Sequence, residues 1–422
     1  MLSHSCFPLS PVPICHTVSG MVRLCRKQLC DNITAHAWSP DAKYIALCPG
    51  TPDVVIYKVD WSKQEPVFTE DTTLKEHLGV VGSIDWSDDG SQIVSVGSDN
   101  IVMWKKEGSK WHSEIVYLAD LTAVNRASWC RAKIAERKRI LVATHKDVYV
   151  LSYKEKVAMW ATLSEKETAT TPTLCASFHP TGSCFAYGTL GGVVGVSSRS
   201  YNPKFDGEVD TLPFGLSGKK KREKSKDKAK KEKVKMLEIQ VPNRYILDTA
   251  FSPSGDVLVY ATSGSEVGCI DSQPRDEFSQ PEPSTLSLTS LPAARMLFID
   301  DWTLLLGCFD GTVHVLRRPH TPGCTQWTAD KEPLAPTESA AASPAAPARS
   351  GQSSRMSDML ARFQQAELRT QDTGSNGGSP LLKKTDRSQH KSSITGLSVI
   401  SVKGAQKVVS TGGDGSLAVW TM

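Results

Sequence analysis

Several features that would place this sequence in other classes of protein are missing. No apolar run approaches the roughly 20 residues of a membrane helix, so a helical membrane span is not expected. The eleven cysteines include no C-x-x-C pair, which argues against a zinc site or a disulfide framework and fits a reducing compartment. Prolines at positions 8, 11 and 13 interrupt the N-terminal apolar stretch, which argues against a secretory signal.

No pattern of catalytic chemistry is present either. The sequence has no recognisable nucleophile–base pair, phosphate-binding loop or cluster with metal-ligand spacing. We therefore expect a protein that is not an enzyme and that has no catalytic residues, metal or cofactor.

The net charge of +4 is unevenly distributed. Eleven basic and three acidic residues lie between Lys219 and Lys235, so the remainder of the chain is slightly acidic. A run of this density is typical of a solvated spacer, and its alternatives are a site for an acidic protein, an anionic membrane or nucleic acid. No aromatic residues interrupt the run, which argues against a specific nucleic-acid site.

One unit recurs along the chain. The unit begins with a strand of alternating apolar residues that ends in an aromatic residue. A polar turn, a second apolar strand, a Gly/Asp turn and a third alternating strand follow. Most copies are separated by the roughly 40–50 residues that one four-stranded propeller blade requires. The seven copies cover residues 35–59, 81–104, 126–153, 174–197, 248–271, 294–317 and 394–420. The sequence therefore predicts an all-β fold, a seven-bladed WD-repeat β-propeller over residues 21–422.

Two copies come near the full WD-repeat signature, in which a histidine, a serine, an aspartate and a tryptophan form a buried hydrogen-bond network. In the last copy the network residues are His390, Ser410, Asp414 and Trp420. In the second copy they are His77, Ser95, Asp99 and Trp104, with a step from Asp to Trp that is one residue shorter. A His/Ser/Asp set also occurs in hydrolases, but its recurrence at blade positions without a nucleophile elbow favours a structural role.

The last copy reaches only its third strand, because the chain stops two residues after Trp420. We expect the segment 21–27 (MVRLCRK) to supply the fourth strand, since closing the ring removes exposed sheet edges.

Two insertions exceed ordinary loops. The basic one spans 199–244, which we place between the fourth and fifth blades, and a Pro/Ala/Ser-rich one spans 319–389, before the last blade. Within the second, residues 355–370 (RMSDMLARFQQAELRT) predict one short amphipathic helix with Ser357 as its N-cap. Its apolar stripe consists of Met356, Met359, Leu360, Phe363 and, less regularly, Leu368. An isolated helix of this length is marginal in water, so we expect it to fold against a groove, either on a partner or on its own propeller.

Several of these motifs together resemble a known family. They are ITAHAWSPDAKYIALCP near the start, LPFG at 212–215, the R-F-Q helix in the second insertion, and STGGDGSLAVW at the end. From about residue 21 to 422 the chain is similar to the WD-repeat subunit, subunit 1, of the actin-related protein 2/3 complex. Residues 1–20 precede the family's usual start, so we expect a disordered or non-native extension there. The lysine run has no counterpart in the family's pattern.

The resemblance implies a non-catalytic, cytoplasmic subunit that acts at the actin cytoskeleton. The family's complex nucleates a daughter actin filament from the side of a mother filament. Implied partners are the other subunits, including the two actin-related proteins, together with the actin filament and nucleation-promoting factors. The resemblance assigns partner contacts in the insertion helix to Arg355, Met356, Met359, Leu360, Phe363 and Gln364. The alternative is a generic WD-repeat scaffold of a nuclear or RNA-related assembly, which only the lysine run favours.

Overall fold

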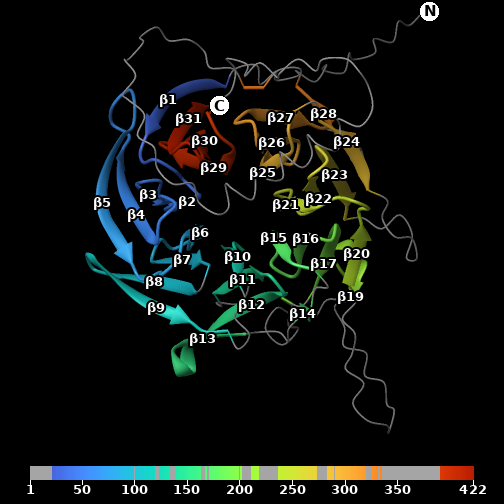
Figure 1. Cartoon of the computed structure of the whole chain (residues 1–422), viewed down its shortest axis with the longest axis horizontal. Coiled ribbons are helices and arrows are strands. Elements are labelled where there is room, and N and C mark those ends of the chain that lie inside the picture. Colours follow the sequence, from blue (N-terminus) through green and yellow to red (C-terminus); the bar gives the residue numbers. More distant parts are fainter. Residues whose placement is uncertain are drawn as a thin grey trace, which may run out of the picture.

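The seven repeats fold into seven antiparallel sheets, because each alternates apolar and polar residues and ends in a tight turn. These sheets are arranged as blades around a central axis (Figure 1), which confirms the predicted seven-bladed propeller. The computed structural model describes residues 21–98, 100–118, 123–132, 138–162, 167–168, 171–198, 200–201, 211–217, 236–272, 283–288, 290–319, 326–330, 333–334 and 390–422.

The first three blades are numbered along the chain, and their strands run from the axis outward. Blade 1 contains β2 (Ala35–Trp38), β3 (Tyr44–Cys48), β4 (Asp53–Asp60) and β5 (Val67–Lys75). Blade 2 contains β6 (Val81–Trp86), β7 (Gln92–Gly97), β8 (Ile101–Glu107) and β9 (Lys110–Val116). Blade 3 contains β10 (Val124–Trp129), β11 (Arg139–Thr144), β12 (Asp147–Lys154) and β13 (Met159–Thr162), with the 3-10 turn η1 (Glu155–Val157) and the short β14 (Glu167–Thr168) beside β12.

The next three blades follow the same order. Blade 4 contains β15 (Thr173–Phe178), β16 (Phe185–Thr189), β17 (Val193–Ser197) and β20 (Met236–Gln240). Blade 5 contains β21 (Ile246–Phe251), β22 (Val257–Thr262), β23 (Glu266–Asp271) and β24 (Ser284–Ser287). Blade 6 contains β25 (Ala293–Asp300), β26 (Thr303–Cys308), β27 (Val313–Arg317) and β28 (Thr328–Ala329).

The two ends of the chain together form blade 7. Its inner three strands are β29 (Ile394–Val402), β30 (Ala405–Gly412) and β31 (Ser416–Thr421), and its outer strand is β1 (Val22–Gln28). The register of β1 against β31 runs from Val22 opposite Thr421 to Gln28 opposite Ser416. This pairing confirms the predicted closure by the N-terminal strand and leaves neither β1 nor β31 without a neighbour on that side.

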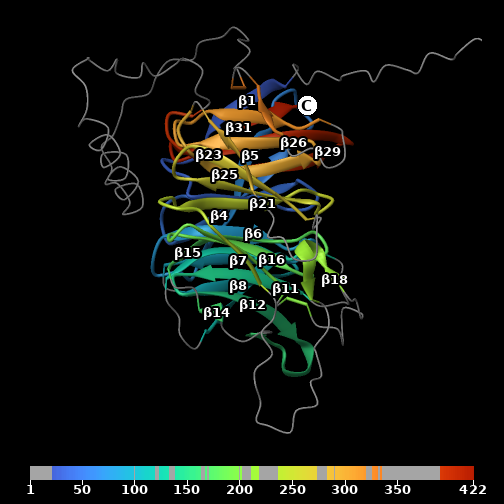
Figure 2. The same cartoon turned by 90° about the vertical axis from the view of Figure 1, so that its right-hand side faces the viewer.

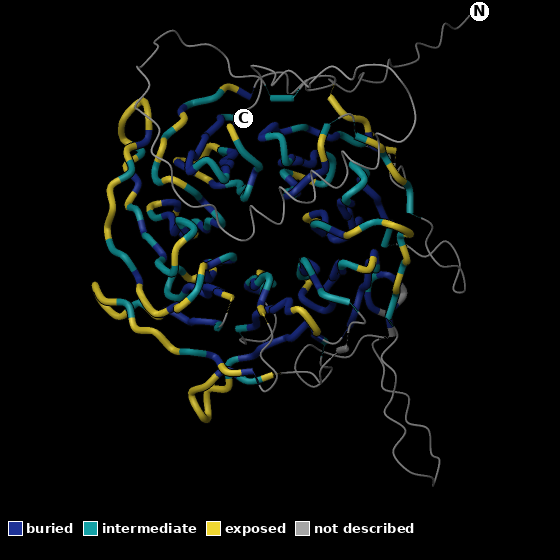
Figure 3. Tube along the Cα trace, viewed as in Figure 1, coloured by how far each residue is buried: buried dark blue, intermediate teal, exposed yellow. Residues whose placement is uncertain are grey.

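The hydrophobic core lies between neighbouring blades. The second strands of several blades, including β11, β22 and β26, are buried along their whole length because an adjacent blade covers each of their faces. One buried cluster, for example, joins Val94 and Val96 of blade 2 to Ile140 and Val142 of blade 3. Exposed residues gather on outer strands such as β5 (Figure 3), which therefore carry a weaker apolar pattern.

That weaker pattern explains why the predicted boundaries of the two insertions are wrong. The fourth strand of blade 4, β20, follows the lysine run and pairs with β17, so the basic insertion lies within blade 4 and not between blades 4 and 5. In the same way β28, the outer strand of blade 6, falls inside the predicted second insertion. Neither strand has a mostly buried face that the sequence could reveal.

The strand order assigns every connection to one of two faces, and Figure 2 shows the blades edge on. One face carries the turns between the second and third strands and the connections between blades, and we call it the upper face. The lower face carries the turns from first to second and from third to fourth strand. Within the described ranges, no helix is long and apolar enough to cross a membrane.

Candidate partner-binding surfaces and the network of the closing blade

The hydrogen-bond network of blade 2 includes three of the four residues predicted for it. His77 Nε2 lies 2.6 Å from the Ser95 hydroxyl, and the Trp104 indole N–H donates to the same oxygen over 2.7 Å. Asp99 lies outside the described residues, and the other ring nitrogen of His77 contacts the Asn100 side-chain oxygen. The network thus links His77, which lies in the connection between β5 and β6, to the second and third strands of blade 2.

The network of blade 7 differs from the predicted one at its last member. His390 Nε2 lies 2.6 Å from the Ser410 hydroxyl, while its Nδ1 lies 2.8 Å from the Ser416 hydroxyl and 3.3 Å from Asp414 Oδ1. The Trp420 indole N–H, however, has no hydrogen-bond partner among the residues that the structure describes. Its ring belongs to an apolar cluster with Met21, Val408 and Ala418, whose side chains offer no oxygen or nitrogen acceptor.

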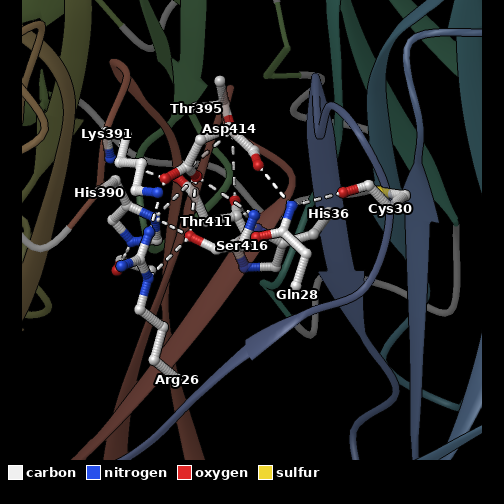
Figure 4. Close-up of polar contacts among 11 residues, drawn as sticks. Arg26, Gln28, Cys30, His36, His390, Lys391, Thr395, Thr411, Asp414 and Ser416 are labelled. Atoms are coloured by element: carbon white, nitrogen blue, oxygen red, sulfur yellow. Dashed lines mark hydrogen bonds and ion pairs between the residues drawn. The ribbon is translucent and has the colours of Figure 1, made fainter. Parts of the chain in front are cut away.

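Asp414 connects this network to the closing strand (Figure 4). Its carboxylate accepts hydrogen bonds from the Lys391 backbone N–H at 2.7 Å and from the Ser416 hydroxyl at 2.7 Å, and it forms an ion pair with Arg26 at 2.8 Å. Gln28, also in β1, donates to the Asp414 backbone carbonyl over 2.6 Å. The N-terminal strand is therefore held by side chains as well as by its backbone ladder.

The surroundings fix the charges of the two ionisable residues in this network. Burial alone raises the pKa of Asp414, but the hydrogen bonds from His390 and Lys391 outweigh it, and the pKa of Asp414 is well below its usual range. Burial lowers the pKa of His390, opposed by its hydrogen bond to Asp414. Asp414 is therefore ionised and His390 neutral near neutral pH.

The arrangement offers no access for a substrate. Ser410 and His390 are both buried in the blade, so the serine hydroxyl cannot reach an external acyl group. Among the described residues, no group of three or more His, Cys, Asp or Glu side chains is placed to hold a metal ion. The polar network thus supports the fold and does not form a reaction site.

The predicted partner-binding residues of the insertion helix lie outside the described residues. The two ends of that insertion are described, and the same turn between β26 and β27 holds both of them. Leu334 N–H donates to the Val313 carbonyl over 2.9 Å, and His390 N–H donates to the Gly311 carbonyl over 3.1 Å. Leu334 and His390, the described residues that flank the predicted helix, therefore both lie at the upper face.

The lysine run is attached to the opposite face, because it connects the third and fourth strands of blade 4. Before it, β18 (Thr211–Leu212), the 3-10 turn η2 (Pro213–Gly215) and β19 (Leu216–Ser217) form a small hairpin from the LPFG motif. The Phe214 ring of this hairpin is buried against Phe251, with centroids 5.7 Å apart, and near His179. This packing fixes the start of the basic insertion to the lower side of blades 4 and 5.

Two further surface features were not predicted from the sequence. On the upper face, Leu78 and Tyr117 project from the connections on either side of blade 2, with 88% and 83% of their surface exposed. On the lower face, a cavity of about 260 Å³ lies between blades 7 and 1, lined by Trp61, Lys403 and Lys407 among others. The sequence could not predict the two exposed residues, because isolated apolar residues in loops show no periodicity. It could not predict the cavity, because the lining segments lie far apart in the sequence.

Comparisons with known proteins agree with this architecture. Residues 68–105 match the family model of the WD domain, G-beta repeat. The chain is 25% identical over 399 residues to actin-related protein 2/3 complex subunit 1B of Arabidopsis thaliana, covering 93% of this chain and 94% of that protein. Subunit 1A of the same organism matches at the same identity and coverage. Subunit 1B-A of Xenopus laevis is 48% identical over 59 residues, 14% of this chain. These similarities confirm the family resemblance that the motifs predict.

Proposed function

We propose that this chain is subunit 1 of an actin-related protein 2/3 complex and acts in actin nucleation and filament branching as a non-catalytic scaffold. The observation that carries the proposal is the similarity to two subunits of that name over 93% of the chain, which spans all seven blades. The buried His/Ser/Asp network, which no substrate can reach, supports a binding role over a catalytic one.

The proposed partners are the other subunits of the complex, including the two actin-related proteins. A rigid closed ring suits this role because each blade presents its loops in a fixed position. Exposed Leu78 and Tyr117 are candidates for one such contact, because both project from the upper face on either side of blade 2. The proposed location is the cytoplasm, at the actin cytoskeleton.

We assign the contact with the mother filament or a nucleation-promoting factor to the helix predicted at 355–370. Both ends of its insertion are attached to the turn between β26 and β27, which supports presentation of the helix from the upper face. The apolar stripe of four or five side chains offers about 1.5–3 kcal/mol for each one buried, offset by the cost of ordering the segment. Weak, reversible binding is the expected result.

The scaffold role is tested by reconstitution. A complex assembled with this chain in place of its own subunit 1 should produce branched filaments when it is activated, as seen by fluorescence microscopy. A complex that assembles with this chain but forms no branches would contradict the role in branching. Failure of this chain to assemble at all would favour the alternative, a WD-repeat scaffold of a nuclear or RNA-related assembly.

The helix is tested separately by Leu360→Ala combined with Phe363→Ala. Loss of these two side chains from the stripe should leave assembly intact and reduce the number of branches per filament length several-fold. The matched control is Leu381→Ala with Leu382→Ala, which removes two leucines of the same insertion outside the predicted helix. Equal branching by the helix variant and the control would remove the assignment.

A further inference from the structure

The cavity of about 260 Å³ on the lower face lies at the seam where the propeller closes. Its wall is formed by the loop between β4 and β5 of blade 1, the turn between β29 and β30 of blade 7, and the closing strand β1. Trp61 and Pro66 supply apolar wall from blade 1. Val402 supplies it from blade 7 and Leu24 from β1. The cavity is therefore an apolar site between the first and last blades.

The charged groups of the cavity wall are all cationic. They are Lys63, Lys403 and Lys407, and no carboxylate of the described residues lines the cavity. Lys403 Nζ donates to the Trp61 carbonyl over 3.2 Å and so bridges the two blades. Lys63 and Lys407 form no ion pair with any residue that the structure describes. Because an ammonium group has three donors and no acceptor, an occupant has to offer acceptors as well as apolar side chains.

A proline-rich segment has this chemistry. Proline keeps its carbonyl acceptor but has no N–H donor. Such segments favour polyproline II, which makes no internal hydrogen bonds and leaves the carbonyls free to accept. Aromatic-lined grooves bind proline-rich peptides in this conformation. Residues 7–13 of this chain, FPLSPVP, contain three prolines, three other apolar side chains and no charge.

The direction of the closing strand places this segment near the cavity. β1 begins at the lower face, where Val22 lies opposite Thr421 at the end of β31. The eleven residues from Pro13 to Leu24, which is part of the cavity wall, span up to about 36 Å when extended. A tether of this length gives an effective concentration on the order of millimolar. The proline-rich stretch that follows Leu334 is instead attached to the upper face.

We propose that residues 7–13 bind in this cavity, with their apolar side chains against Trp61 and their carbonyls accepting hydrogen bonds from Lys63 and Lys407. The end of the chain that closes the ring then also covers the seam between blades 7 and 1. A segment of seven residues buries little area, so the binding is weak and global unfolding does not depend on it. The proposal stands independently of the proposed function.

The experiment uses the full-length chain with the photoreactive analogue p-benzoylphenylalanine in place of Phe7. Irradiation of a dilute sample, followed by mass spectrometry, should give cross-links within one chain to residues 61–66 or 402–407. Alanine substitutions that add N–H donors and loosen the extended conformation should lower the yield of these cross-links at least threefold. They are Pro8→Ala, Pro11→Ala and Pro13→Ala, made together.

A matched control changes three prolines of the second insertion. It combines Pro336→Ala, Pro344→Ala and Pro347→Ala and should leave the cross-link yield unchanged. Cross-links that join two chains, or that fall on other blades, would overturn the proposal. Equal yields from the parent chain and the variant with alanines at positions 8, 11 and 13 would also overturn it.

The lysines are tested in the same assay. Lys63→Ala combined with Lys407→Ala removes two donors from the cavity wall and should lower the cross-link yield at least threefold. The control is Lys154→Ala with Lys156→Ala, which removes two exposed lysines from the lower side of blade 3. Equal yields from the two double variants would show that the wall lysines do not hold the segment.

Hydrogen exchange provides a measurement that does not depend on the photoreactive analogue. Amides of residues 61–66 and 402–407 should exchange at least twofold more slowly in the full-length chain than in a chain that lacks residues 1–20. Amides of residues 87–91, in a lower-face turn of blade 2, should exchange equally in both chains. Equal exchange at the cavity in the two chains would overturn the proposal, whatever the outcome for filament branching.

Discussion

Blades 2 and 7 carry the same His–Ser pair but use it differently. Blade 2 is continuous in sequence, and its histidine, serine and tryptophan hydrogen-bond to one another. Blade 7 combines the two ends of the chain, and its histidine is joined instead by Ser416 and by Asp414, which also holds Arg26 of the closing strand. The comparison indicates that a shared motif stabilises a local blade in one case and the closure of the whole ring in the other.

Removal of the closing strand should have the largest effect. A chain that lacks residues 1–28 loses β1, which leaves β31 unpaired on one side, removes Cys25 from an apolar cluster and uncovers Leu417 and Val419 of the same cluster. We expect aggregation or loss of cooperative unfolding, measured by gel filtration and thermal denaturation. A chain that lacks only residues 1–20 is the control and should unfold like the full chain. Cooperative unfolding of the shorter chain would show that the ring closes without β1.

Asp414→Ala should be the most damaging single substitution in the comparison. It leaves the Lys391 N–H, the Ser416 hydroxyl and Arg26 without their acceptor, at an expected cost of about 3 kcal/mol in the free energy of unfolding. Asn100→Ala in blade 2 removes one contact to His77 and should cost about 1 kcal/mol. Equal losses for the two variants in urea denaturation would contradict the special role of Asp414.

Acidification should weaken blade 7 through the same two residues. The pKa of Asp414 is lowered on folding, so its stabilisation is full above the unfolded value near 4 and decreases as the pH falls below it. The pKa of His390 is also lowered, so its contribution decreases as the pH falls below about 6.5. The difference in urea midpoint between the wild-type chain and Asp414→Ala should therefore narrow from pH 7 to pH 3.5. A constant difference would mean that folding does not lower the pKa of Asp414.

The smallest expected effect separates the two tryptophans. Trp104→Phe removes a hydrogen bond to Ser95, whereas Trp420→Phe removes an indole N–H that has no acceptor within the described ranges. Both variants lose similar apolar volume, so Trp104→Phe should be more destabilising by about 1 kcal/mol. The measurement is the free energy of unfolding of both variants, and the reverse order would show that Trp420 does donate a hydrogen bond.

Much of the fold follows from the sequence because inner strands have a regular pattern. The aromatic residues before the turns, such as Trp38 and Trp86, identify the first strand of a blade, and closure by residues 21–27 follows from the missing fourth strand of the last copy. Outer strands such as β20 are half-exposed, so their apolar pattern was too weak to place them. The ion pair between Arg126 and Asp248 could not be predicted, because it joins strands of blades 3 and 5 that no local spacing relates.

The central claim is that this closed propeller works as a subunit of a larger assembly. The most direct test is affinity purification of the tagged full-length chain from its own cells, followed by mass spectrometry of the proteins that remain bound in stoichiometric amounts. The account predicts two actin-related proteins together with the remaining small subunits of the complex. Recovery of the chain without actin-related proteins, or with a stable set of nuclear proteins in their place, would contradict it.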